Sequence, residues 1–390
     1  MDLKAFRRHR LNLAAEQAGV DLLVATLPAN IEYVSGYVSV GQNVVHSTQS
    51  YALYVPSEDR FLFAVSLAEV PGIVERVGED AQIFPYGAFR FCHHSDGFLS
   101  KLVQEKSLSS FASGEEALIA AIRSTGKTKI ALDESRITRT SWEKVANALP
   151  DCTFISGQPV FLQARIIKHP EEIAGIERAA EIAAESLEAV LKHFRPGMTE
   201  LDLEWAYREE VTSRKAEPYF IVATGDLRAA YADVCNTDLV IQRLIRFDYG
   251  CIYNGYRSDI ARTAVIGEPD QKTKTYYNAV LAGTREAIKA MKPGVPASEI
   301  FHIAVEVTRR NGIPHYARHH CGHGIGLEAY DMPSIAPSCD IRLEKGMVCC
   351  IETPYYELGW GGVQIENTVE VTETGTRYLD KSSDELIVLA

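Results

Sequence analysis

Two helix corners of the same kind, 97 residues apart (293 − 196 = 97), constrain the fold of this chain more than any other feature. At each corner an amphipathic stretch stops at a proline-glycine pair, Pro196-Gly197 or Pro293-Gly294, and a new helix opens a few residues later. Strand-like sequence follows each pair of helices. We therefore expect two αα-ββ halves that pack as one α+β unit, with helices outside and a curved antiparallel sheet inside. The alternative is that Pro-Gly recurs by chance, since the residues around the two corners share little identity.

The length of the chain, 390 residues, exceeds what one compact core usually serves, so two domains are expected. From Asp21 to about Gly157, short apolar runs alternate with helical stretches, which is typical of an α/β domain without a phosphate-binding loop or dinucleotide fingerprint. At Pro170 the pattern changes to a long amphipathic helix. We place a smaller α/β domain at residues 1–160 and the α+β domain at residues 161–390.

Charge and hydropathy exclude several classes of partner. The formal net charge is −12 and no run of lysine and arginine is present, so nucleic acid is not an expected partner. The first 19 residues carry charges among their apolar positions, unlike a signal peptide, and no apolar run approaches the roughly 20 residues of a membrane span. The eight scattered cysteines, with no C-x-x-C pair, are expected to be reduced thiols. We expect a cytoplasmic protein that has no membrane partner.

The stretch from Ile245 to Ile266 is typical of a β-hairpin with Asn254-Gly255 at its turn, the strongest short-range hairpin signal. Asp248 and Asp259 lie on opposite arms and can come close across the ladder. Two acids that face each other in a sheet repel, so their presence indicates a cation between them. Either acid alone would be read as a turn or surface residue.

A second cluster, from His319 to Gly326, holds three imidazoles in five residues beside three glycines. Glycine allows the backbone to approach another group closely, and neutral imidazole is the commonest metal ligand. Because glycine flanks His323 on both sides, we favour His323 as a ligand over a purely structural histidine.

A third segment, from Met347 to Val371, places Glu352 at the end of one apolar strand and Glu366 inside another. A glutamate buried in apolar β-sequence is costly unless it is paired or bound to metal. The alternative for Glu366 is a surface-facing position, since Glu370 continues the same alternation.

From about residue 165 to the end, these clusters resemble the pita-bread metallohydrolases, the family of methionine aminopeptidase, aminopeptidase P, prolidase and creatinase. The family's ligands run Asp, Asp, His, Glu, Glu, with a gap of 11 between the aspartates that this chain shares (259 − 248 = 11). The resemblance maps this set onto Asp248, Asp259, His323, Glu352 and Glu366. Residues 1–160 look like the α/β accessory domain of creatinase and prolidase, so the resemblance implies a pita-bread catalytic domain at residues 161–390.

The resemblance also implies roles for these residues. Asp248 would chelate one metal ion, Asp259 and Glu366 would bridge two, and His323 with Glu352 would hold the second. A hydroxide that bridges the pair would attack the scissile carbonyl, with Glu352 as the candidate for proton transfer. Two divalent ions are expected; manganese suits so oxygen-rich a site, and cobalt, zinc or iron would also fit.

The chain departs from the family's peptidases around this set. Tyr231 or Ala230 stands where they carry a substrate-contacting histidine, Tyr330 stands where they carry a second histidine, and Gln364 replaces an arginine. His319, four residues before His323, is kept. We therefore name Glu352, His319 and Tyr330 as the candidate catalytic residues; tyrosine can donate a hydrogen bond to an oxyanion but is a poor proton shuttle at neutral pH. The alternatives are that Tyr330 only packs, and that His46 or His93-His94 fills the gap.

The expected function is a dinuclear metal-dependent hydrolase that resembles Xaa-Pro dipeptidase or aminopeptidase P and cleaves an amide C–N bond in a small peptide or peptide-like substrate. The alternative is a non-peptidase of the same fold, a creatinase- or ectoine-hydrolase-like hydrolase or a lyase, acting on a small N-substituted metabolite. A non-catalytic binding protein is disfavoured, because it has no need of four converging acids. The resemblance also implies a homodimer.

Overall fold

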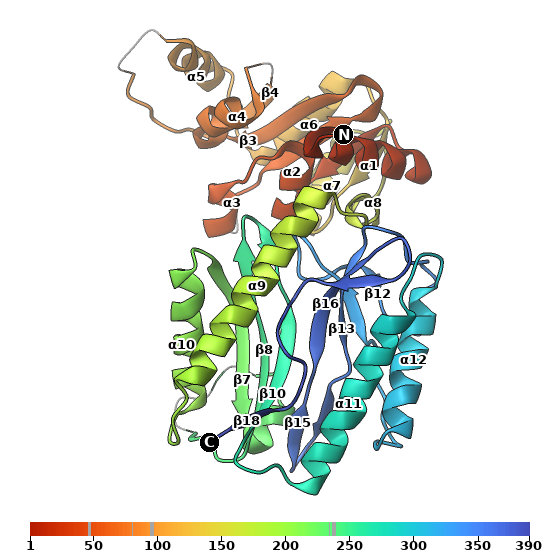
Figure 1. Ribbon diagram of the computed structural model, residues 1–390. Helices are drawn as coiled ribbons and strands as arrows, with labels where there is room; N and C mark the ends of the chain where they lie inside the picture. The colour runs from red at the N-terminus through yellow and green to blue at the C-terminus, as the bar shows by residue number, and fades with distance from the viewer. Residues whose placement is uncertain (46–47, 80, 94–96, 234, 236–238) are drawn as a thin grey trace. The chain divides into compact units, whose positions relative to one another are not determined.

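The computed structural model describes residues 1–45, 48–79, 81–93, 97–233, 235 and 239–390 (Figure 1). The chain divides into two compact units, Met1–Arg165 and Ile166–Ala390, and each is described by itself. No helix within the described ranges is long and apolar enough to cross a membrane.

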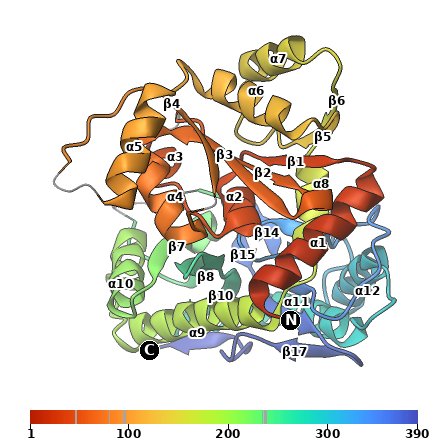
Figure 2. The ribbon, with the colours of Figure 1, turned by 90° about the horizontal axis from the view of Figure 1, so that it is seen from above.

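The first unit is a six-stranded mixed sheet with helices around it (Figure 2). The strand order is β4-β3-β2-β1-β5-β6, for the strands β1 (Leu22–Ala25), β2 (Tyr51–Val55), β3 (Arg60–Ser66), β4 (Gln82–Tyr86), β5 (Lys129–Leu132) and β6 (Thr153–Ser156). Strand β2 pairs antiparallel with β1 and β3, and the other pairs are parallel. The helices are α1 (Leu3–Ala18), α2 (Pro28–Ser35), α3 (Val40–Val44), α4 (Val70–Val77), α5 (Phe98–Leu108), α6 (Gly114–Thr125), α7 (Arg139–Ala148) and α8 (Gln158–Arg165). The expected α/β character of this half is confirmed.

The second unit contains both helix corners that the sequence indicates. Helix α9 (Pro170–Lys192) is followed by α10 (Glu200–Ser213), and α11 (Gln271–Ala290) by α12 (Ala297–Arg310). At the two corners Gly197 and Gly294 adopt φ +97° and φ +90°, a left-handed conformation that glycine tolerates without strain. In Figure 1 each helix pair lies along the sheet, with α9 and α10 beside β7 (Glu217–Gly225) and β8 (Leu244–Tyr253).

The second unit's sheet has ten strands and is antiparallel except where one strand joins β10 in parallel. Its main path is β12-β11-β13-β16-β10-β8-β7, with β17 on β16, β18 on β10 and β9 on β8. The strands not yet given are β9 (Tyr256–Arg257), β10 (Ile260–Ile266), β11 (Gly322–Gly324), β12 (Asp331–Ser334), β13 (Val348–Glu352), β16 (Glu366–Val371), β17 (Thr376–Tyr378) and β18 (Ile387–Leu389). A separate hairpin joins β14 (Tyr355–Glu357) to β15 (Gly361–Val363). The predicted α+β class, with helices outside an antiparallel sheet, is confirmed.

The hairpin predicted at Asn254-Gly255 is present between β8 and β9. Both turn residues have positive φ, +48° and +85°, as a two-residue hairpin turn of the favoured twist requires. Further along the same arms Asp248 pairs with Ala261, and Asp259 falls between β9 and β10. The two aspartates are therefore close along the sheet and not directly opposite each other.

Helices α11 and α12 cross with almost no space between their backbones at Gly283. A Cβ atom there would lie 2.0 Å from Thr308 Oγ1 and 2.9 Å from the carbonyl oxygen of Ala304. We predict that Gly283→Val lowers the free energy of unfolding by about 2 kcal/mol or more, because overpacking a tight contact forces the helices apart. Urea unfolding followed by circular dichroism measures the change.

The control is Gly375→Val, since Gly375 has no atom within 4 Å of a built Cβ and its φ is not positive. Its unfolding free energy should stay within about 0.5 kcal/mol of wild type. Equal losses in the two variants would contradict the close crossing of α11 and α12.

Candidate metal centre

Four strands of the sheet and the segment between β9 and β10 bring the candidate ligands to one place. Along the path β11-β13-β16-β10-β8, Glu352 pairs directly with Glu366, Glu366 pairs with Ala261, and Ala261 pairs with Asp248. His323 on β11 pairs with Cys350, two residues before Glu352. One cavity of about 240 Å³ is lined by all five candidates and by four further residues, Tyr219, Phe220, Ala329 and Tyr330.

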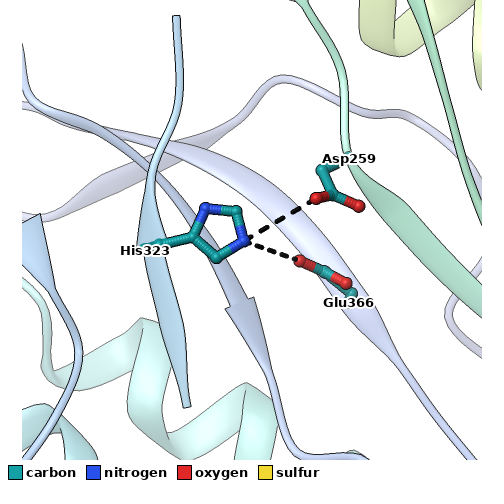
Figure 3. A group of neighbouring side chains, drawn as sticks. All are labelled: Asp259, His323 and Glu366. Atoms are coloured by element: carbon teal, nitrogen blue, oxygen red, sulfur yellow. Dashed lines mark ion pairs between the residues drawn. The ribbon is translucent and has the colours of Figure 1, made fainter. Parts of the chain in front are cut away.

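Three of the candidates form a tight group (Figure 3). One ligand atom each of Asp259, His323 and Glu366 lies within 4.8 Å of the others, and all three side chains are buried. His323 Nε2 is 3.7 Å from Asp259 Oδ2 and 3.9 Å from Glu366 Oε1, so these pairs are too far apart to be hydrogen bonds. Ligand atoms that share an ion at about 2.0–2.2 Å are spaced in this way.

The orientation of His323 also suits metal binding. Its Nδ1 lies 3.0 Å from the carbonyl oxygen of Gly324 and donates to it, because a carbonyl can only accept. That hydrogen bond places the ring proton on Nδ1 and leaves the lone pair of Nε2 facing the two carboxylates.

The carboxylates carry an electrostatic cost that a cation would relieve. Within the described ranges, Asp259 Oδ1 and Glu366 Oε1 are buried and have no hydrogen-bond partner. Burial and then neighbouring carboxylates raise the pKa values of both groups well above their usual range. Burial likewise raises the pKa of Asp248 to about 6, although Arg246 opposes the shift. Four carboxylates and one imidazole that face such a space fit hard divalent ions.

Glu352 differs from the other acids because basic groups surround it. His320 Nε2 lies 2.9 Å and Arg318 Nη2 lies 3.6 Å from Glu352 Oε1. Burial pushes the pKa of Glu352 upward, but His320 and Arg318 outweigh it and the pKa ends below its usual value. Glu352 is thus held as a carboxylate at neutral pH.

Of the other two candidate catalytic residues, Tyr330 lines the cavity and His319 does not. Tyr330 is 64% exposed and its ring stacks on His323, with centroids 3.9 Å apart and an interplanar angle of 25°. Partial burial and the four acids raise the pKa of Tyr330 above its usual range, so it stays a hydrogen-bond donor. His319 is exposed, and its neighbour His320 is the one that contacts Glu352.

Sequence reasoning missed three residues of the site, His320, Arg318 and Arg246. The signal for His320 was present in the triple-histidine cluster, but the resemblance selected His319 by its spacing of four residues from His323. The structure instead brings His320 to Glu352.

The positions that depart from the expected pattern also lie around the site. Gln364 is buried and its amide nitrogen lies 3.2 Å from Asp248 Oδ2. The carbonyl oxygen of Tyr231 accepts a hydrogen bond from Arg246, and the Tyr231 side chain is 37% exposed. His46 and His94, proposed as substitutes for the missing histidines, lie outside the described residues. His93 contacts Ser100 Oγ at 2.7 Å in the first unit.

Comparison with known proteins agrees with the resemblance inferred from the ligand pattern. Residues 174–373 match the family described as metallopeptidase family M24, and residues 7–167 match the creatinase/prolidase N-terminal domain. A Xaa-Pro dipeptidase of Pyrococcus furiosus is 38% identical over 233 residues, which are 58% of this chain and 67% of that protein. The solved structure of a Xaa-Pro dipeptidase from Bacillus anthracis is 26% identical with a TM-score of 0.82, over 98% of this chain and 99% of that one. The solved structure of the prolidase from Pyrococcus horikoshii OT3 is 25% identical with a TM-score of 0.81, again over 98% of this chain and 99% of that one.

The raised pKa values predict how the metal-free protein responds to pH. Asp248, Asp259 and Glu366 hold protons more tightly when folded than when unfolded, so their contribution to stability is present at low pH and is lost as the pH rises. The loss begins near about pH 4, where unfolded carboxyl groups titrate, and for Asp248 continues through about pH 6.

Asp259→Asn removes one of these charges. In chelator we expect this variant to be more stable than wild type by about 1 kcal/mol or more at pH 7.

Thermal melts at a series of pH values measure the difference between the two proteins, which should shrink toward pH 4 as the wild-type acids become neutral. Asp151→Asn, at an exposed acid of the first unit, is the control and should follow wild type. A gap between wild type and Asp259→Asn that stayed constant with pH would contradict the buried charge cluster.

Proposed function

Because the chain belongs to metallopeptidase family M24, we propose that it is a metal-dependent hydrolase that cleaves the C–N bond before proline in small peptides. The observation that carries this proposal is the convergence of four carboxylates and one imidazole on one cavity, from strands β8, β11, β13 and β16 and the segment between β9 and β10. The Xaa-Pro dipeptidases among its relatives support the substrate class.

We assign the metal site to Asp248, Asp259, His323, Glu352 and Glu366, with Asp259 and Glu366 between two divalent ions. The unpartnered oxygens of Asp259 and Glu366 support this assignment. Manganese is the preferred ion on ligand chemistry, and cobalt, zinc and iron remain alternatives. Bound divalent ions would activate water and stabilise the negative charge that develops on the substrate carbonyl.

The remaining chemistry falls to side chains of the chain itself. Glu352, kept ionised by His320 and Arg318, can accept a proton from the attacking water and pass it to the leaving nitrogen. The Tyr330 hydroxyl is a donor at the mouth of the cavity and can hydrogen-bond the developing oxyanion. His319 is exposed and does not line the cavity, so we assign it no proton-transfer step.

The cavity favours a small substrate with an apolar part. Its volume of about 240 Å³ is below the range of roughly 300–1,000 Å³ that is usual for small-molecule sites. Tyr219, Phe220 and Tyr330 supply aromatic surface next to the acids. A proline ring beside the scissile bond matches that surface, so a dipeptide is the expected substrate.

A second candidate substrate class follows from one observation. Tyr330 lines the cavity at a position where the resemblance led us to expect a histidine. The site therefore has fewer proton-transfer groups than we expect of the family's peptidases. A small N-substituted amino acid, which like a dipeptide contains a C–N bond next to an acidic group, would fit the same cavity.

The activity test uses protein stripped by chelator and then reloaded with Mn²⁺. We expect it to release proline from an alanyl-proline dipeptide only after reloading, whereas Asp259→Asn binds no metal and gives no turnover, and Asp151→Asn behaves as wild type. Elemental analysis and proline release measure the two properties. If reloaded protein cleaved neither dipeptides nor longer Xaa-Pro peptides but cleaved N-substituted amino acids, the second candidate would replace the first.

Tyr330→Phe tests the hydroxyl separately from the ring. Phenylalanine keeps the stack on His323 and removes only the donor, so kcat should fall by about 10²- to 10³-fold while KM changes little. Steady-state kinetics on the best substrate provides the measurement. A wild-type kcat in this variant would show that Tyr330 merely packs.

A further inference from the structure

Gln364 links the acids of the metal centre to a single arginine. Its amide nitrogen lies 3.2 Å from Asp248 Oδ2, 3.4 Å from Glu352 Oε2 and 3.4 Å from Glu366 Oε2. Its amide oxygen accepts from Arg246 Nη1 at 3.0 Å and from the Tyr356 hydroxyl at 3.1 Å. Since Gln364 is neutral and only 1% exposed, it aligns these groups but supplies no charge.

Arg246, on strand β8 and 2% exposed, supplies the charge. Its Nη1 lies 3.3 Å from Asp248 Oδ2, the same oxygen that Gln364 contacts. Arg246 and Asp248 are two positions apart along the strand, so both side chains project from the same face of the sheet. The contact is therefore built into the regular geometry of β8.

The guanidinium of Arg246 is fixed on every side. Its Nε donates to the carbonyl oxygen of Ala229 at 2.8 Å, and its Nη2 donates to that of Tyr231 at 2.5 Å. The Tyr356 ring covers it, with 5.1 Å from the guanidinium carbon to the ring centroid. Because these carbonyl groups are neutral, they fix the guanidinium without neutralising its positive charge, which remains available to attract Asp248.

Asp248 needs such a partner more than the other candidate ligands do. It lies outside the tight group of Asp259, His323 and Glu366, and its side chain is partly exposed. Its side-chain hydrogen bonds in the described structure come from Arg246 and Gln364, and both reach Oδ2. The other carboxylate oxygen, Oδ1, accepts no side-chain hydrogen bond in the described structure and is available to a ligand.

We propose that Arg246 is the positioning residue for Asp248: with Gln364 it holds one carboxylate oxygen of Asp248 and so leaves the other free to bind a metal ion. The inference rests on the proposed metal-dependent function. The resemblance led us to expect an arginine at position 364, where this chain has Gln364. Arg246 would then supply the positive charge that Gln364 lacks, from strand β8.

The test is Mn²⁺ binding to chelator-stripped protein by isothermal titration calorimetry, with melts of the metal-free protein to verify folding. Wild type should bind two ions. Arg246→Met should retain one tight ion and bind the second about 10- to 100-fold more weakly, the usual cost of removing a partner that orients a metal ligand. The reciprocal exchange, Arg246→Gln with Gln364→Arg, returns the cation from position 364, in the segment between β15 and β16, and should restore the second ion.

The matched control is Arg243→Met. Arg243 stacks on Trp360 at 5.8 Å and donates to its carbonyl oxygen, as Arg246 does with Tyr356 and Tyr231. Its ion pair is with Asp270 at 3.6 Å, and it does not line the cavity that holds the candidate ligands. This variant should bind both ions as wild type does.

Two tight ions in Arg246→Met would overturn the role of Arg246 and leave the proposed function intact, whereas no Mn²⁺ binding by wild type would overturn both. If Arg246→Met did not fold, the exchange variant would decide: two tight ions support the inference, and a single ion overturns it.

Discussion

Repulsion among four carboxylates in one buried sheet is the constraint on which the second unit depends. Glu352 and Glu366 stand directly opposite each other on β13 and β16, an arrangement that destabilises a sheet when the charges are alike. Asp259 joins them because the hairpin places it between β9 and β10, beside β16. The antiparallel register and the helices that cover the sheet hold these acids together, and a cation among them would turn the repulsion into attraction.

The charges around the centre are arranged unequally. The two acids at its edges each have an arginine, Arg246 at Asp248 and Arg318 at Glu352. In the described structure the group between them, Asp259, His323 and Glu366, makes no ion pair with an arginine, and it includes carboxylate oxygens without hydrogen-bond partners. This division keeps the edges oriented before any ion binds and leaves the middle open for metal.

Much of this fold could be predicted from sequence because its signals are local. Asn254-Gly255 specifies its turn through backbone conformation, and Glu352 and Glu366 are anomalies within apolar strand sequence. The residues that surround the acids carry no such signal. Arg246 has the pattern of an ordinary strand residue, and its partners Ala229 and Tyr231 come from a separate segment. His320, and not the expected His319, contacts Glu352, because which of two adjacent imidazoles reaches the site depends on the local backbone path and not on residue type.

We propose that the second unit holds a pair of metal ions between Asp259 and Glu366. The most direct measurement is an anomalous difference map from crystals grown with Mn²⁺, recorded at the manganese absorption edge. We expect two peaks about 3.5–4 Å apart, each within bonding distance of both carboxylates. A map without peaks in this cavity, or with peaks only at surface acids, would contradict it.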